Sequence, residues 1–295
     1  MIFNNPEGCY YFTPSGFKTK SEIHFSIIIS AFQAFKFNAS ALHIHTALLF
    51  LMNSFLLLPF YFLLTISNMN NKTIINGHPF ISFIPENISA EECLHKSENF
   101  RDNMLKRRSI RHFSDKPVSE QIIKNILAVG NSAPSGANKQ PWTFCVIKDT
   151  FIKKQIREAA EKEEYESYHG RMPQEWLDDL AHLQTDWHKP FLETAPYIII
   201  VFKKSYEVLA DGRKKNYYYV QESVGIATGF LIAAIHQAGL VTLTHTPSPM
   251  NFLIKILNRP ENEKPFLVLP VGYAADNCIV PDLKKRNVED VSVFY

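Results

Sequence analysis

A long stretch without charge dominates the N-terminal part of this sequence. Residues 37–71 contain no Asp, Glu, Lys or Arg, and residues 47–66 within them read ALLFLMNSFLLLPFYFLLTI. A helix needs about 20 largely apolar residues to cross about 30 Å of hydrocarbon, and this segment reaches that length. Pro59 is compatible with a membrane helix. We therefore predict a transmembrane anchor over residues 37–68, preceded by an N-terminal tail over residues 1–36.

Two other structures must be weighed for the same run. A buried core helix rarely needs so long an uncharged stretch, and a cleaved signal peptide has an apolar segment of only about 7–15 residues near its N-terminus. The lysines at 18, 20 and 36 precede the run and only Lys72 follows it closely, which is a weak bias for a cytosolic tail. The sequons at Asn71 and Asn87 agree with that orientation. We expect a single-pass protein of the plasma or a vesicle membrane, and the side of its catalytic domain stays open.

The charge balance and the missing motifs exclude several classes of protein. Lys+Arg 31 against Asp+Glu 29 gives a net charge of +2, so a dedicated nucleic-acid binder is not expected. The cysteines are scattered and form no CxxC pair, which predicts neither a disulfide framework nor a zinc site. There is no GxxxxGK[ST], GxGxxG, GxSxG or HExxH. We predict no metal site.

The rest of the chain reads as a linker followed by one domain. Residues 69–105 begin with a polar stretch, and Pro79 and Pro85 interrupt regular structure there. Residues 106–295 alternate between helical and strand patterns, so helices and strands mix in one unit. The apolar run over residues 223–238 is typical of a core helix, with Gly239 as its stop. Further helices are predicted after Ser119, after Asp149 and over 176–187, and strands over 142–147, 197–202, 240–244 and 266–271.

Two segments of this domain carry chemical information. The first reads RRSIR, from Arg107 to Arg111, and arginine presents a planar fork of donors that suits phosphate oxygens and carbonyls. Taken alone, this segment is better interpreted as a solvated basic patch. The second reads SAPSGANKQPW over residues 132–142, where Pro134 and Gly136 favour a tight turn that lets backbone N–H groups approach a ligand. By itself it is an ordinary helix-to-strand loop.

Together the two segments resemble the flavin signature of the nitroreductase family of FMN enzymes, in which RRSIRxF precedes a helix and then SAPSGAxxxPWxF. Four further segments are similar to the iodotyrosine deiodinases within that family: residues 157–196, 214–222 (KKNYYYVQE), 239–247 (GLVTLTHTP) and 269–286 (LPVGYAADNCIVPDLKKR). The resemblance covers about residues 100–295, and an N-terminal membrane anchor also agrees with animal members. It implies an α+β, nitroreductase-like FMN fold, with a mixed sheet flanked by helices, in a homodimer whose flavin sites lie between the subunits.

The resemblance also implies a set of FMN-binding residues. A first set, from the RRSIR segment and the C-terminal region, would hold the phosphate and the N1/C2 edge of the ring. A second set, from the turn at 134–136, would contact the flavin. A third set would line the ring, with the Thr246 hydroxyl near N5 as the catalytic group. These positions are Arg107, Arg108, Ser109, Ile110, Arg111 and Arg286; then Pro134, Ser135 and Gly136; then Thr244, His245 and Thr246. Positive charge beside a reduced flavin matches the negative charge that it carries.

A substrate set follows from the same resemblance. Glu164, Tyr168 and Lys189 would close over a bound amino acid, with the carboxylate on the α-ammonium and the lysine on the α-carboxylate, and the backbone N–H of Ala137 would meet the phenolate. Without the resemblance, Glu164 reads as part of a solvated acidic helix. The implied reaction is FMN-dependent reductive dehalogenation of mono- or diiodotyrosine, or of bromo- or chlorotyrosine, to tyrosine and halide. An NADPH-dependent reductase is the implied electron donor.

Some positions depart from the vertebrate pattern, and two other functions stay open. Asn138, Lys139 and Gln140 replace a different trio, and His245 stands where threonine is usual, which bears on substrate preference. A broad NAD(P)H-dependent nitro- or quinone reductase would use the same fold without the Glu164 set. A membrane-tethered protein that binds flavin or tyrosine derivatives without catalysis would bind ligand and release no halide.

Overall fold

The computed structural model describes residues 4–5, 8–13, 16–19 and 72–295 of the chain. The predicted transmembrane anchor over residues 37–68 therefore lies outside the described residues. Among the residues that are described, no helix combines the length and the apolar character that crossing a bilayer requires. The chain divides into two units, Met1–Asn87 and Ile88–Tyr295.

The first unit contains short antiparallel strands. Strands β1 (Asn4–Asn5), β2 (Gly8–Thr13) and β3 (Gly16–Thr19) form one small sheet. Strands β4 (Lys72–Ile75) and β5 (His78–Ile81) form a hairpin. Asn76 and Gly77 close this hairpin with φ values of 50° and 82°, the conformation in which a two-residue turn favours Asn-Gly.

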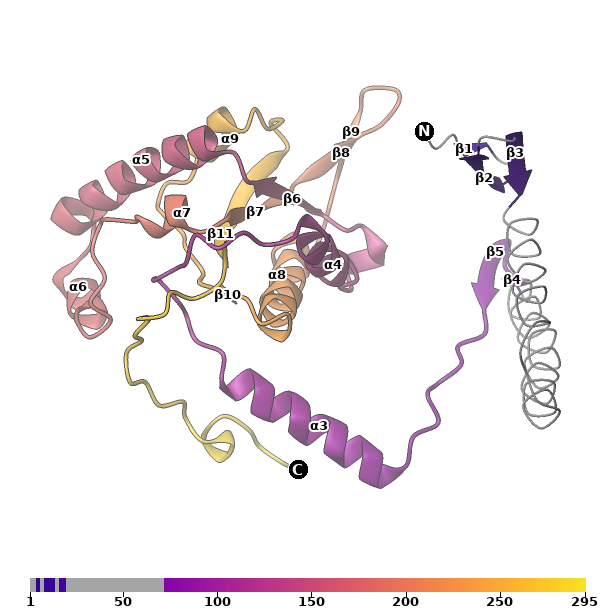
Figure 1. The fold of residues 1–295 in the computed structure, drawn as a ribbon, viewed down its shortest axis with the longest axis horizontal. Helices are drawn as coiled ribbons and strands as arrows, with labels where there is room; N and C mark the ends of the chain where they lie inside the picture. Colours follow the sequence, from indigo (N-terminus) through magenta and orange to yellow (C-terminus); the bar gives the residue numbers. More distant parts are fainter. Residues whose placement is uncertain (1–3, 6–7, 14–15, 20–71) are drawn as a thin grey trace, which may run out of the picture. The chain divides into compact units, whose positions relative to one another are not determined.

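The second unit is an α+β domain (Figure 1). Its helices are α3 (Ala90–Leu105), α4 (Glu120–Asn131), α5 (Thr150–Glu166), α6 (Gln174–Ala181), α7 (Phe191–Thr194), α8 (Val220–Gln237) and α9 (Phe252–Ile256), with short turns η1 (Gly136–Asn138), η2 (Ser167–Arg171) and η3 (Val288–Asp290). Its strands are β6 (Trp142–Ile147), β7 (Tyr197–Lys204), β8 (Tyr206–Val208), β9 (Lys214–Asn216), β10 (Val241–Thr242) and β11 (Glu263–Gly272).

A four-stranded sheet in the order β10-β11-β7-β6 organises this domain. All its neighbouring strands are antiparallel, and a parallel bridge from Ser109 to Thr242 makes the sheet mixed, as predicted. Strand β7 is buried on both faces because its side chains alternate between two cores. Tyr197, Ile199 and Val201 pack toward α4 and α8, whereas the residues between them pack toward α5, α7 and α9. Figure 1 shows these two groups of helices on opposite sides of the sheet.

Most predicted elements are confirmed near their predicted bounds. Asp149 caps α5 by accepting a hydrogen bond from the backbone N–H of Ile152 at 2.8 Å. Ser119 is the N-cap residue of α4, although its side chain makes no capping bond. Helix α8 ends before Gly239, whose φ of +74° is one that glycine adopts without strain.

Three expectations differ from the structure. The predicted helix over 176–187 ends at Ala181, because the chain turns at Gln184 with a positive φ of 48°. The predicted strand over 240–244 pairs only at Val241–Thr242, and the chain rejoins the sheet at His245 through a bridge to Val268. The core helix α8 buries one face only, and Ile226 and Phe230 on its other face remain 42% and 38% exposed.

The region predicted as a linker contains a helix that the sequence analysis missed. Helix α3 begins after Ser89, whose side chain accepts a hydrogen bond from the backbone N–H of Glu92 at 3.1 Å. Its C-terminal end is attached to α8, since Asn103 Nδ2 donates to Gln237 at 2.6 Å and the Asn103 carbonyl pairs with His236. The spacing S-x-x-E from Ser89 to Glu92 is the signal that marks such a helix start. No residue of α3 is buried, so the apolar periodicity used for the other helices was absent here.

Candidate active site

The RRSIR segment is held at the edge of the sheet. The backbone N–H of Ile110 donates to the carbonyl of Thr242 at 3.1 Å, and Phe113 forms a bridge with Ala274. In such an extended segment successive side chains point to opposite sides. Ile110 lies in the core with 8% exposure, and the arginines beside it are half-buried. The backbone hydrogen bonds thus fix the positions of the arginine Cα atoms, and the guanidinium groups extend away from the sheet edge.

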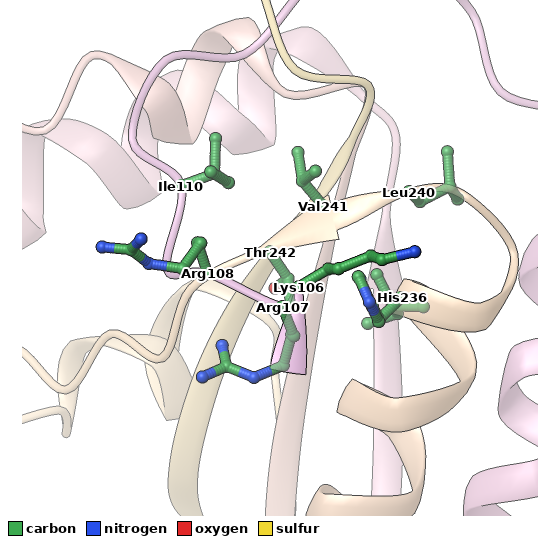
Figure 2. A pocket seen from close by; sticks show the side chains of 9 residues that line it. Lys106, Arg107, Arg108, Ile110, His236, Leu240, Val241 and Thr242 are labelled. Carbon is green, nitrogen blue, oxygen red and sulfur yellow. The ribbon is translucent and has the colours of Figure 1, made fainter. Parts of the chain in front are cut away.

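A cavity of about 100 Å³ lies beside this segment (Figure 2). Lys106, Arg107, Arg108 and His236 line its polar wall, and Leu240 is among its apolar residues. Figure 2 shows the guanidinium groups of Arg107 and Arg108 pointing to one side and Lys106 lying next to His236 on the other. The cationic side chains on its wall suit an anionic group such as a phosphate.

The arginines of the described chain fall into two groups. In residues 72–295, those at 101, 157, 171, 213 and 259 each form an ion pair with a carboxylate. The remaining ones form no ion pair with an acidic side chain in this part of the chain, and Arg108 donates to the Pro281 carbonyl instead. They are Arg107, Arg108, Arg111 and Arg286, the positions that the sequence analysis assigned to the cofactor. Arginines that pair with no carboxylate of the described chain fit an anionic ligand such as a phosphate.

Glu164 and Lys189 form a buried ion pair. Lys189 Nζ lies 3.4 Å from Glu164 Oε2, and the two residues are 4% and 8% exposed. Lys189 Nζ also donates to the Asp186 carbonyl, and its backbone N–H donates to Glu161 Oε1 at 2.8 Å. Charged groups are seldom buried unless they are paired. The solvated acidic helix considered for Glu164 is therefore wrong.

Burial dominates the electrostatics of this pair. It raises the pKa of the Glu164 carboxyl above its ordinary value, although the positive charge of Lys189 acts in the opposite direction. It also lowers the pKa of the Lys189 ammonium, against the attraction of Glu164. Both groups thus pay a desolvation cost that their mutual attraction offsets only in part. A ligand that brings its own ammonium and carboxylate has strong partners here.

Tyr168 and Arg111 complete the cluster. Helix α5 ends at Glu166 and continues as the π-turn η2, which turns Tyr168 toward the pair. Lys189 Nζ lies 5.5 Å from the centre of the Tyr168 ring, and the Tyr168 hydroxyl donates to the Thr185 carbonyl at 3.3 Å. The charge of Arg111 acts on Tyr168 and Lys189 alike. The structure therefore brings the predicted substrate set and one member of the RRSIR segment together.

The segment from Thr244 to Thr246 alternates in exposure. Thr244 and Thr246 are exposed, whereas His245 between them is 7% exposed and its ring meets Phe191 edge-on at 5.7 Å between centroids. Thr246 thus has its hydroxyl available to a ligand, as its predicted role requires. His245 points into the protein, and its backbone N–H and carbonyl are both bonded to Val268 at 3.0 Å, so its predicted contact with the flavin ring stays a prediction.

The SAPSGA loop adopts an unusual backbone and lies apart from this cluster. Ala137, Asn138 and Gln140 have positive φ values of 46°, 54° and 46°. Ser135 Oγ accepts from the backbone N–H of Gln140 at 2.9 Å, and Lys139 pairs with Glu207 at 3.4 Å. Figure 1 shows the loop that follows α4 well separated from α6 and the C-terminal end of α5. Pro134, Ser135, Gly136 and Ala137 are therefore not brought to Glu164, Tyr168 and Lys189 within one chain.

Two supporting residues escaped the sequence analysis. Glu161 accepts from the Lys189 backbone and pairs with Arg157 at 2.6 Å, and Asp186 offers its carbonyl to Lys189. Glu161 lies three positions before Glu164, so the helical spacing places both on one face. That spacing was a usable signal for Glu161. No sequence signal could have pointed to the backbone carbonyl of Asp186, because every residue has a backbone carbonyl.

Comparisons with known proteins show which family this chain resembles. A family model described as the nitroreductase family matches residues 104–273. A protein named iodotyrosine deiodinase from Haliscomenobacter hydrossis is 59% identical over 216 residues, which are 73% of this chain and 97% of that protein. Iodotyrosine deiodinase 1 from Homo sapiens is 41% identical over 214 residues, which are 72% of this chain and 74% of that protein. A crystal structure of oxidized iodotyrosine deiodinase bound to FMN and 3-iodo-L-tyrosine has a TM-score of 0.56 and 33% identity, and covers 66% of this chain and 98% of that chain.

Proposed function

The chain belongs to the iodotyrosine deiodinases of the nitroreductase family, and we propose that it reductively removes halogen from halotyrosines with FMN as its cofactor. In this reaction a pair of electrons and a proton replace the carbon–halogen bond by a carbon–hydrogen bond, and halide leaves. The products are tyrosine and a halide ion, iodide for mono- and diiodotyrosine.

One observation carries this function, the buried pair of Glu164 and Lys189. Their charges are opposite to those of an amino-acid ammonium and carboxylate, and they lie 3.4 Å apart without a ligand. A zwitterion can exchange partners with the pair, so that Glu164 takes the ammonium and Lys189 the carboxylate. A ligand with only one of these charges leaves a buried group unpaired, which costs about 1–3 kcal/mol or more. A general nitro- or quinone reductase has no use for such a filter.

The residues present fit FMN. Arg107, Arg108 and Arg286 have the donors that hold a phosphate, and Arg111 adds positive charge on the side of the substrate set. The exposed hydroxyl of Thr246 is available as a donor to the ring. FMN supplies the electrons for the reduction when it is bound. Burial of Glu164 and Lys189 excludes water from the end of the site where the amino acid is recognised.

We also propose that the enzyme is a homodimer. The SAPSGA loop and the Glu164 cluster are separated within one chain, so a second copy is needed to bring a loop to each cluster. Helix α8 offers a surface for this contact, because Gly225, Ile226, Gly229 and Phe230 form an exposed small and apolar face. A Cβ atom at either glycine would meet nothing within 4 Å, so the face is open to close approach.

The membrane anchor and the electron donor remain proposals that rest on sequence. The charge-free segment over residues 37–68 would tether the domain, and an NADPH-dependent reductase would reduce the flavin. We predict that the full chain stays in the membrane fraction after alkaline carbonate extraction and that a chain beginning at residue 72 does not. Glycan mapping at Asn71 and Asn87 shows on which side of the membrane the catalytic domain lies. Release of the full chain by carbonate contradicts the anchor.

We expect the purified domain, reduced anaerobically and mixed with 3,5-diiodotyrosine, to release iodide and reoxidise its flavin. Halide is measured with an ion-selective electrode, and flavin oxidation by its absorbance. A nitroaromatic substrate in a parallel reaction is expected to turn over at least about tenfold more slowly, because it satisfies neither Glu164 nor Lys189. Preference for the nitroaromatic would identify a general reductase. Binding of diiodotyrosine without halide release would identify a protein that only binds it.

A further inference from the structure

His245 holds a buried nitrogen atom that has no partner. Its ring is 7% exposed, and in residues 72–295 its Nε2 is one of the two buried side-chain polar atoms without a hydrogen bond, the other being the hydroxyl of Tyr197. Buried polar atoms are nearly always bonded, so an orphaned one calls for a reason. Nothing in the proposed reaction uses this atom.

The surroundings of the ring decide what the atom can do. Phe191 meets the ring edge-on and offers no hydrogen-bonding group. The charged groups that act on it are Lys189 and Arg111, and Lys189 acts more strongly. Both have only N–H donors, so the complementary partner is an imidazole nitrogen with a free lone pair. Burial and these two cations lower the pKa of His245 to about 3, so the ring is neutral at neutral pH, and its tautomer protonated at Nδ1 carries the lone pair on Nε2.

Lys189 has a reason to need such an acceptor. Without ligand its ammonium is bonded to Glu164 and to the Asp186 carbonyl. When a zwitterion takes Glu164, the ammonium loses that contact and turns toward the ligand carboxylate. A second fixed acceptor then limits the positions that the flexible lysine side chain can occupy.

We propose that His245 is a positioning residue, which accepts a hydrogen bond at Nε2 from the Lys189 ammonium in the halotyrosine complex and so holds Lys189 on the substrate carboxylate. This inference rests on the proposed function, because it requires the zwitterion to separate Lys189 from Glu164. Threonine at this position, usual in the vertebrate pattern, has a shorter side chain than histidine. Through this contact His245 adds selectivity for a ligand that carries a carboxylate.

The test compares two ligands that differ only in the carboxylate, 3-iodotyrosine and 3-iodotyramine, with the FMN-loaded enzyme. We expect His245→Met to weaken iodotyrosine binding about tenfold, measured by quenching of flavin fluorescence, and to leave iodotyramine and FMN binding within about threefold. His245→Gln keeps an acceptor and is expected to recover most of the iodotyrosine affinity. Equal losses for both ligands, or none for iodotyrosine, would overturn the proposal. If the unchanged enzyme fails to bind iodotyrosine, the proposed function itself is wrong.

A double-mutant cycle identifies the donor. If His245 acts through Lys189, then His245→Met added to Lys189→Met costs no further iodotyrosine affinity. A full additional loss in the double variant would instead point to Arg111 and overturn the assignment. The ratio of affinities between the unchanged enzyme and His245→Met is also expected to stay constant from pH 6 to pH 8, since His245 is neutral throughout. A ratio that changes through this range would show a protonated His245 and contradict the acceptor role.

Discussion

Replacing Glu164 with Gln is expected to raise the KM for 3-iodotyrosine about a hundredfold and to change FMN affinity by less than about threefold. Glu164 is buried, and we propose that its carboxylate meets the substrate ammonium. A charge-assisted hydrogen bond of this kind contributes about 1.5–3 kcal/mol. Glutamine keeps the shape and loses the charge. Steady-state halide release gives the KM, and flavin fluorescence titration gives the FMN affinity.

Glu163→Gln is the matched control, because Glu163 is adjacent and pairs with the exposed Arg171 at 2.8 Å. We expect it to leave the KM nearly unchanged, since exposed ion pairs contribute about 0–1 kcal/mol. Glu164→Gln also leaves Lys189 without its partner, so the melting temperature is measured in both variants, with and without FMN. Equal losses of substrate and FMN affinity in Glu164→Gln contradict a substrate role.

The pH dependence offers a further readout of the same experiment. Substrate binding requires the Glu164 carboxylate to be ionised, and burial raises its pKa. The KM of the unchanged enzyme is therefore expected to rise as the pH falls, beginning at a higher pH than for an ordinary glutamate. Glu164→Gln has no such proton to bind and loses this part of the pH profile.

Replacing Ile226 and Phe230 together with Asp is expected to convert the proposed dimer to monomers and to reduce bound FMN to less than about a tenth. The two side chains lie four residues apart on the exposed face of α8. Burying two carboxylates without partners in an interface costs several kcal/mol each, which exceeds what most dimers can absorb. Flavin is lost as well, because each proposed site takes its SAPSGA loop from the other copy.

The matched control is Phe151→Asp, which changes an equally apolar residue, 67% exposed, on α5. Helix α5 lies on the opposite side of the sheet from α8 (Figure 1), so this variant is expected to remain a dimer and to keep its flavin. Analytical ultracentrifugation gives the mass and the absorbance ratio gives the flavin content. A double variant that stays dimeric would place the interface elsewhere. A monomer with full flavin content would show a site complete in one chain.

The spacing of apolar residues and the N-cap residues were sufficient to predict the elements that bury an apolar face. Strand β7 was predicted from six consecutive strongly apolar residues, and α5 from Asp149 followed by apolar residues at helical spacing. Helix α3 was missed because it buries no side chain and so lacks an apolar stripe. For helix α8 the sequence predicted too much burial, because only one of its faces is buried. An apolar face looks the same in sequence whether the same chain covers it or not.

The sequence by itself determined the family and predicted the arginine positions and the substrate set, because these inferences depend on which residue types occur in which order. Only the tertiary structure decided that Glu164 and Lys189 are buried partners and that Arg111 acts on both Lys189 and Tyr168. It also separated the SAPSGA loop from that cluster. The physical reason is that burial and electrostatic pairing depend on distances across the fold, and spacing along the chain does not encode them. The unpartnered nitrogen of His245 belongs to the same category, since a histidine becomes an orphaned acceptor only through what surrounds it.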